Sequence, residues 1–215
     1  MLRPLFAHEH AKTRGTRLSP SLVLCLQWWL EVLSMNLQES RMWRSIETCP
    51  IHLFADARGH PPRLAAVLLA DGKTHYTDWE PPPSLLAIFI SRKDQQIMGL
   101  ELLAIALGFS TFANLLEGRR VFVWSDNVGT ESCARKGTAR QWDHACIVHS
   151  LWKRAAALQC ELYVERVPTA VNIADLPSRE EYKLLHAIRA LYCEPYLDTA
   201  FWQPDAWEAL SLRDV

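Results

Sequence analysis

The sequence of 215 residues lacks several features that would assign a function class directly. No apolar run reaches the ~18 residues that a membrane-spanning helix needs, so we expect no membrane association. The net charge is −1, so no general excess of basic residues points to nucleic acid, and such a contact must come from local patches. The six cysteines include no CxxC pair, which is typical of reduced, buried thiols in an intracellular protein, nuclear or cytoplasmic.

The composition is otherwise that of a globular protein with a sizeable core. Apolar residues make up 49% of the chain, and its length fits one domain with extensions. We expect an N-terminal arm and a helix over residues 1–45, a main domain over 46–190, and a C-terminal tail with a short helix over 191–215. Ser19 and Pro20 are typical of a cap and a first helical residue, so the first helix should begin there.

The main domain contains the patterns of an α/β fold. Asp71-Gly72 is typical of a tight turn, so the first three strands should form an antiparallel meander. The last two strands need helical crossovers and should run parallel to the first. We therefore predict a five-stranded mixed sheet, three strands antiparallel and two parallel, with flanking helices. The expected strands cover residues 51–57, 63–70, 73–80, 120–126 and 160–167. The expected helices cover residues 95–116, 128–135, 141–158 and 173–191, while residues 85–90 are either a short strand or a packed loop.

Four carboxylates stand at distinctive places in this pattern. Asp56 and Asp126 end two apolar strands, Glu101 lies inside a helix, and Asp175 begins another helix. Acids at the ends of neighbouring parallel strands emerge at one edge of a sheet. Like charges are costly to bury together without a compensating cation, and oxygen ligands favour Mg²⁺ or Mn²⁺. Two such ions ~4 Å apart can activate water and stabilise the leaving oxygen in phosphodiester hydrolysis.

The phrases around these acids resemble those of a known family. They are DA at 56–57, LELLA at 100–104, SDN at 125–127 and VPTAVNIADLPSR at 167–179. Together they resemble the ribonuclease H domain of reverse transcriptases, most closely that of DIRS-type (tyrosine-recombinase) retrotransposons, and are similar to the hepadnavirus polymerase. LSPSLVLCLQWWLEVL at 18–33 also resembles the helix that joins polymerase to ribonuclease H in DIRS-type enzymes.

This resemblance implies a ribonuclease H-like fold and a nuclease that hydrolyses the RNA strand of RNA–DNA hybrids. Asp56, Glu101, Asp126 and Asp175 would be both the catalytic residues and the ligands of two Mg²⁺ or Mn²⁺ ions. A reverse transcriptase polymerase domain is an expected partner, because the chain has no Y-x-D-D phrase of its own. The segment before Asp175 lacks the histidine that cellular ribonucleases H carry there.

Two candidate substrate contacts lie beside the acids. Many relatives have asparagine three residues before the helix glutamate, where this chain has Met98, and either Gln95 or Gln96 is a candidate to replace it. Asn127 follows a catalytic-type acid and is either a reader of the RNA 2′-OH or a helix cap.

Four basic residues are further candidates for binding the hybrid. Arg135, Lys136 and Arg140 follow Asp126 and form either a patch that tracks a phosphate backbone or a solvated loop. Arg179 either contacts phosphate near the metals or pairs with a neighbouring glutamate.

Two other functions remain open from the sequence. An integrase or transposase of the same fold would need a late glutamate, and Glu161 lies at about the right distance beyond Asp126, although at a strand start. A non-catalytic module that binds nucleic acid or protein is the other alternative, favoured by Met98, the missing histidine and the near-neutral charge.

Overall fold

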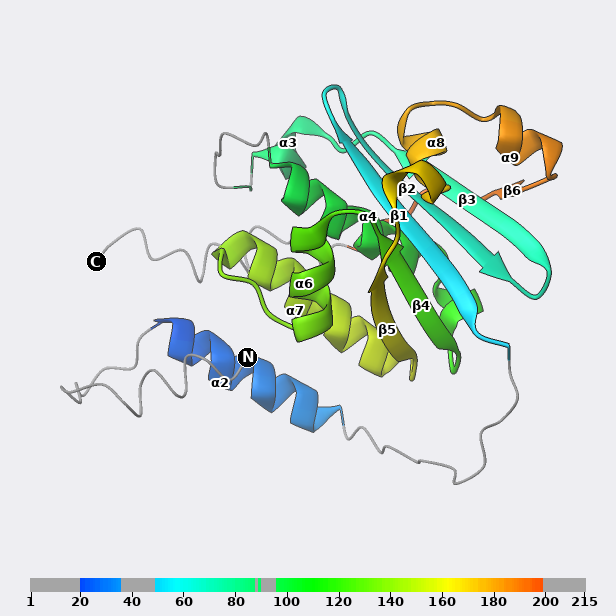
Figure 1. Ribbon diagram of the computed structural model, residues 1–215. Helices are drawn as coiled ribbons and strands as arrows, with labels where there is room; N and C mark the ends of the chain where they lie inside the picture. Colours follow the sequence, from blue (N-terminus) through cyan, green and yellow to red (C-terminus); the bar gives the residue numbers. More distant parts are fainter. Residues whose placement is uncertain (1–19, 36–48, 88, 90–95, 199–215) are drawn as a thin grey trace. The chain divides into compact units, whose positions relative to one another are not determined.

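The computed structural model describes residues 20–35, 49–87, 89 and 96–198 (Figure 1). Helix α2 (Pro20–Ser34) begins at the predicted proline and belongs to a compact unit separate from the one that holds the sheet. The predicted arm of residues 1–17 and the short helix expected near the C-terminus lie outside the described residues.

A mixed sheet forms the centre of the fold, as predicted. Its order is β5-β4-β1-β2-β3-β6, with β1, β2 and β3 antiparallel and β4 and β5 parallel to β1 (Figure 1). The strands are β1 (Ile51–Gly59), β2 (Pro62–Ala70), β3 (Lys73–Trp79), β4 (Arg120–Ser125), β5 (Glu161–Arg166) and β6 (Leu191–Tyr192).

The predicted count of five strands was wrong, because the tail contributes a sixth. In β6, Leu191 pairs in parallel with His75 of β3, and the amide of Cys193 donates to the Tyr76 carbonyl at 2.8 Å. A strand of two residues is too short to show an alternating pattern, so only the tertiary structure reveals it.

The helices differ from the prediction mainly where the chain turns sharply. Residues 85–90 include the end of a short helix, and the helix expected over 95–116 is interrupted at Phe112. The single helix expected over 173–191 was wrong, because Glu180 has a φ of 63° and this left-handed residue separates two short helices. The helices are α3 (Pro83–Leu86), α4 (Ile97–Thr111), α5 (Ala113–Leu116), α6 (Val128–Lys136), α7 (Trp142–Ala157), the 3₁₀ turn η1 (Thr169–Val171), α8 (Asp175–Ser178) and α9 (Lys183–Ala187).

Helix α4 is enclosed by the fold. It packs against β1 and β2 on one side and α7 on another, and residues 99–110 are all buried. The backbone of α4 lies close to the sheet at Gly108, because a Cβ added there would be 2.9 Å from Leu53 Cδ1. A polar side chain in the buried part of this helix, residues 99–110, is therefore shielded from bulk solvent unless it lies at an edge of the sheet.

The opposite face of the sheet carries a second core. Successive strand residues point to opposite faces, so Phe54 and Val67 face away from the Leu53 side that meets α4. There they pack with Ala174 and Leu185, from the segment that contains α8 and α9. Asp56 has the same parity as Phe54 and therefore points toward α8.

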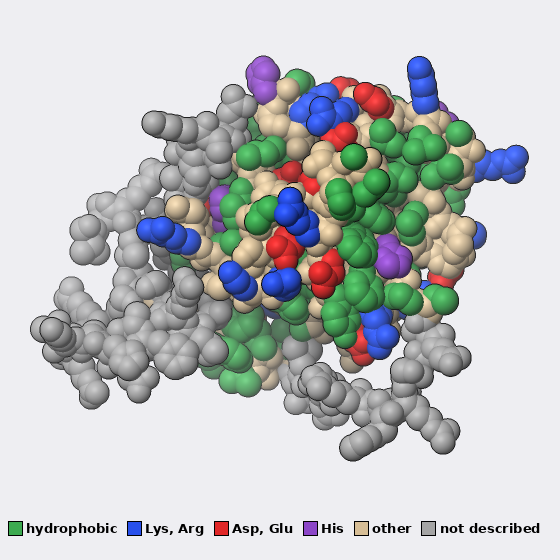
Figure 2. All heavy atoms as spheres, viewed as in Figure 1, with side chains coloured by type: hydrophobic (Ala, Val, Ile, Leu, Met, Phe, Trp, Pro, Cys, Tyr) green, Lys and Arg blue, Asp and Glu red, His purple; other side chains and the backbone are tan. Residues whose placement is uncertain are grey.

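Aromatic rings tie the parallel strands together on this second face. The ring centroids of Phe122 and Tyr163 are 5.1 Å apart, and those of His52 and Phe122 are 5.7 Å apart. Trp124 Nε1 donates to His52 Nδ1 at 3.0 Å. Figure 2 shows hydrophobic side chains gathered over β1, β4 and β5. Such cross-strand pairs stabilise strands that no hairpin connects.

Two expectations about compartment can be compared with the fold. Among the described residues, no helix is long and apolar enough to cross a membrane. All six cysteines are free, but only Cys25 and Cys146 are buried, so the expectation of buried thiols holds for two of them.

Candidate metal centre

The pairing of β1 with β4 brings Asp56 and Asp126 to one end of the sheet. Ile51 pairs with Val121 and Phe54 with Trp124. The same register carried two residues further puts Asp56 level with Asp126, which directly follows the last residue of β4. The prediction that both acids leave the sheet at the same edge is confirmed.

Glu101 reaches this edge from α4. Pairing between β4 and β1 ends at Phe54, so the β1 edge beyond it has no strand beside it on that side. Glu101 accepts a hydrogen bond from the Ala57 backbone there, and only 5% of its surface is exposed. Glu101 thus lies on a buried helix, but its carboxylate is at the unpaired edge of β1.

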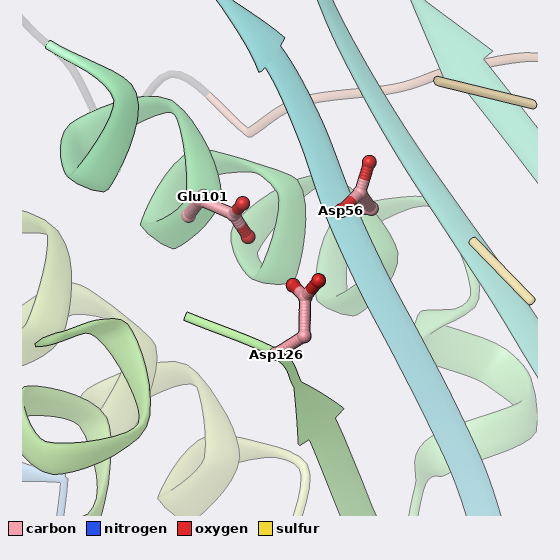
Figure 3. Close-up of side chains that lie close together, drawn as sticks. All are labelled: Asp56, Glu101 and Asp126. Carbon is pink, nitrogen blue, oxygen red and sulfur yellow. The ribbon is translucent and has the colours of Figure 1, made fainter. Parts of the chain in front are cut away.

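Three carboxylates converge at this point. One oxygen from each of Asp56, Glu101 and Asp126 lies within 4.8 Å of the other two. Figure 3 shows the side chains of Glu101, from α4, and Asp126, from the end of β4, directed toward the space beside Asp56 on β1. No similar group of three or more ligand residues occurs elsewhere in the described part of the chain.

Burial and mutual repulsion disfavour ionisation of two of these acids. Burial, followed by the charges of Asp56 and Asp126, raises the pKa of Glu101 to about 9. Burial also raises the pKa of Asp56 to about 6, and Asp126 and Asp175 add to this, while a hydrogen bond from Ser178 opposes it. A cation between the carboxylates would remove this repulsion and restore the charged forms.

The site passes a test of fit for a divalent cation. Glu101 Oε2 is buried and has no hydrogen-bond partner among the described residues. A buried oxygen without a partner costs free energy unless something binds it. The donor set is all carboxylate oxygen, which is what Mg²⁺ and Mn²⁺ prefer.

Asp175 stands apart from the other three acids. It is the first residue of α8, and its Oδ1 accepts a hydrogen bond from Arg179 Nε at 2.7 Å. The expectation that all four carboxylates share one group therefore holds for three. Asp175 is close enough for its charge to raise the pKa of both Asp56 and Glu101.

Two partners of Asp56 were not singled out from the sequence. Ser178 Oγ donates to Asp56 Oδ2, and Asn172 Nδ2 lies 3.5 Å from Asp56 Oδ1. Both residues are buried and belong to the phrase that contains Asp175. Their spacing from Asp175 was visible, but nothing local indicated a contact with a strand more than a hundred residues earlier.

The two amide candidates for substrate contact each precede a helix, and Asn127 directly follows Asp126. Gln96, with a φ of 58°, precedes α4, and Asn127 precedes α6. Asn127 Oδ1 accepts from the amides of Gly129 at 2.9 Å and Thr130 at 3.1 Å, so its role as a helix cap is confirmed. Reading of a 2′-OH by either residue stays a prediction.

The basic candidates lie on exposed surface. Arg135 Nη1 pairs with Glu131 at 3.0 Å, and Lys136 and Arg140 are exposed. Figure 2 shows basic side chains beside acidic ones over α6, so the patch is mixed in sign. Arg179 pairs with Asp175, four residues before it, and not with the glutamates that follow.

Glu161 lies far from the acid group along the sheet. It is the first residue of β5, pairs in register with Arg120 at the start of β4, and its Oε2 is 2.9 Å from Arg120 Nε. Asp126 follows the other end of β4. Because β4 and β5 are parallel, Glu161 cannot complete a set with Asp126 in this structure.

Comparison with known proteins adds no assignment. Neither the models of known protein families nor the curated proteins give a match to this sequence.

Proposed function

We propose that this protein is a metal-dependent nuclease with a ribonuclease H-like fold, which hydrolyses the RNA strand of RNA–DNA hybrids. The observation that carries the proposal is the convergence of the Asp56, Glu101 and Asp126 carboxylates, together with a buried Glu101 oxygen that has no hydrogen-bond partner among the described residues. The mixed sheet, with three antiparallel strands followed by two parallel ones, supports it, as does the resemblance of the phrases around the acids.

The three convergent carboxylates would hold Mg²⁺ or Mn²⁺, with Asp175 beside them as a candidate for a second ion. Such ions lower the pKa of bound water and stabilise the leaving oxygen when water attacks phosphorus. In that reaction the P–O3′ bond breaks, leaving a 3′-hydroxyl and a 5′-phosphate. The protein contributes rigid placement of the acids, since strand ends and a buried helix hold them.

The hybrid would approach over the starts of α4 and α6. Gln96 and Asn127 lie at those two starts, and Arg135, Lys136 and Arg140 follow along and beyond α6. Phosphate contacts position a nucleic acid, while groups that reach the 2′-OH distinguish RNA from DNA. This assigns substrate placement to the basic residues and strand choice to the amide side chains.

The test compares wild-type protein with Asp126→Asn on a labelled RNA–DNA hybrid, duplex DNA and duplex RNA in Mg²⁺ or Mn²⁺. We expect cleavage of the hybrid alone, and a loss of at least ~10³-fold in the variant, since each ion supplies several kcal/mol of transition-state stabilisation. Asp71→Asn is the matched control, because Asp71 is an exposed residue in the β2–β3 turn.

Two results would contradict the proposal. Cleavage that persists in Asp126→Asn would mean that the acids are misassigned. A metal-loaded wild-type protein that binds the hybrid but never cuts it would instead favour the non-catalytic binding module.

A further inference from the structure

The two oxygens of the Asp56 carboxylate have different surroundings. Oδ2 accepts the hydrogen bond from the Ser178 hydroxyl. Oδ1 lies 3.5 Å from Asn172 Nδ2, at the outer limit of a hydrogen bond, and the same nitrogen is closer, at 3.2 Å, to the Ala55 carbonyl. Oδ1 therefore keeps lone pairs for a cation, whereas Oδ2 is engaged.

The Ser178 hydrogen bond is sheltered and favoured over its local competitor. Only 1% of Ser178 and 5% of Asp56 is exposed, so water does not compete. Ser178 Oγ also lies 3.0 Å from the Asp175 carbonyl, but a hydroxyl has one proton, and an ionised carboxylate is the stronger acceptor. In Figure 3 one Asp56 oxygen points away from Glu101 and Asp126.

The segment after Ser178 is held on the sheet by a charged cluster. Glu180 bonds to Arg58 and Arg63, each at 3.0 Å, and the Tyr182 hydroxyl donates to Asp78 at 3.0 Å. These contacts reach β1, β2 and β3. They leave Ser178 little freedom to withdraw from Asp56.

We infer that Ser178 is a positioning residue that limits Asp56 to one-oxygen binding of a divalent cation, and so selects Mg²⁺ or Mn²⁺ over Ca²⁺. The inference rests on the proposed function, because it takes the three-carboxylate group as the cation site. It goes beyond that function by assigning metal selectivity to a residue that is not itself a ligand.

The selectivity follows from the coordination that each ion prefers. Mg²⁺ takes six ligands at ~2.0–2.1 Å in nearly ideal octahedral geometry, whereas Ca²⁺ takes six to eight and readily binds a carboxylate through both oxygens. Because Oδ2 accepts the Ser178 hydrogen bond, a second bond from Asp56 to the same ion must compete with that hydrogen bond. Removing the hydroxyl frees Oδ2, and the ion that gains from this is Ca²⁺.

The experiment is calorimetric titration of the full chain with MgCl₂, MnCl₂ and CaCl₂ at constant ionic strength, without nucleic acid. We expect Ser178→Ala to raise the affinity for Ca²⁺ relative to Mg²⁺ by about tenfold, the lower range for changes to groups that orient metal ligands. Ser178→Thr keeps the hydroxyl and should keep the wild-type ratio. Should the alanine variant not fold, Ser178→Cys, with a weaker donor of similar size, should shift the ratio in the same direction.

The outcomes separate this inference from the proposed function. If the Ca²⁺ to Mg²⁺ affinity ratio is unchanged in Ser178→Ala, or shifts equally in Ser178→Thr, the role of Ser178 is overturned. The metal site itself would still stand, provided that the wild-type protein binds the ions and Asp126→Asn does not. Wild-type protein that binds none of these ions through Asp126 would overturn both.

Discussion

Glu101 illustrates how the fold sets the chemistry of one side chain. The rest of α4 around it is apolar and buried. The Glu101 carboxylate can therefore find polar partners only at the edge of the sheet. Its pKa moves from an ordinary 4.5 to about 9, chiefly through burial. At neutral pH without metal, the native state therefore holds a proton on Glu101 that the unfolded chain has already lost.

Glu101→Gln should make the stability of the metal-free protein less dependent on pH. The raised pKa means that the stability contributed by protonated Glu101 is complete below pH ~4.5 and falls as pH rises toward about 9. Glutamine has no proton to lose, so at pH 7 the variant should be more stable by up to about 3 kcal/mol. Urea unfolding at pH 5 and pH 8 in EDTA measures this.

The control for this prediction is Glu161→Gln. Glu161 is exposed and pairs with Arg120 at the sheet edge, away from the buried acids, so its replacement should leave the difference between pH 5 and pH 8 as in the wild type. Equal pH dependence in wild type and Glu101→Gln would contradict the burial argument.

Helices α8 and α9 show how short elements depend on tertiary contacts. They have four and five residues, well below the length at which a helix is stable alone. Their segment is held by the apolar core around Val67 and by the charged cluster of Arg58, Arg63, Asp78 and Glu180. Ser178 reaches Asp56, and Asp175 comes close enough for its charge to act on the metal centre, because this segment is anchored.

Arg63→Ala should destabilise the protein by about 3–5 kcal/mol, the usual cost of leaving one partner of a buried ion pair unpaired. Arg63 bonds to Asp78, whose side chain is only 8% exposed. Arg120→Ala removes an exposed pair with Glu161 and should cost less than about 1 kcal/mol. Denaturant unfolding of both variants measures the difference, and equal small losses would show that the charged cluster does not hold the segment.

At the scale of the whole molecule, the candidate metal centre joins the two faces of the sheet. Glu101 comes from α4 on one face, and Asp56 points toward α8 on the other. Asp126 directly follows β4, whose end leaves the edge of β1 unpaired between these two faces. A cation bound there would contact groups that only the complete fold brings together. Its binding is therefore coupled to global unfolding.

Millimolar Mg²⁺ or Mn²⁺ should raise the unfolding temperature of the wild-type protein. An ion that binds only the native state adds about 2.7 kcal/mol at one hundred times its Kd. Asp126→Asn should lose most of this shift and Asp71→Asn should retain it, and EDTA should reverse it. Differential scanning calorimetry checks this, and an equal shift in all three proteins would mean that the ions bind elsewhere.

Local sequence patterns determined most of the elements and three of the site residues. Asp71 and Gly72 both have positive φ, as the predicted tight turn requires, and Gly137 ends α6 in the left-handed region. Alternating strands and helical periods depend on neighbours a few residues away, so they can be recognised without the fold. Asp56 and Asp126 could be placed together because parallel strands end at the same edge of a sheet.

Only the tertiary structure decided the features that depend on distant partners. The hydrogen bond from Ser178 to Asp56 spans 122 residues, and β6 exists because the tail returns to β3. The break at Glu180 lets the chain turn so that its side chain meets Arg58 and Arg63, which outweighs local helical preference. The separation of Asp175 from the other acids depends on how the anchored segment crosses the sheet, which no local pattern encodes.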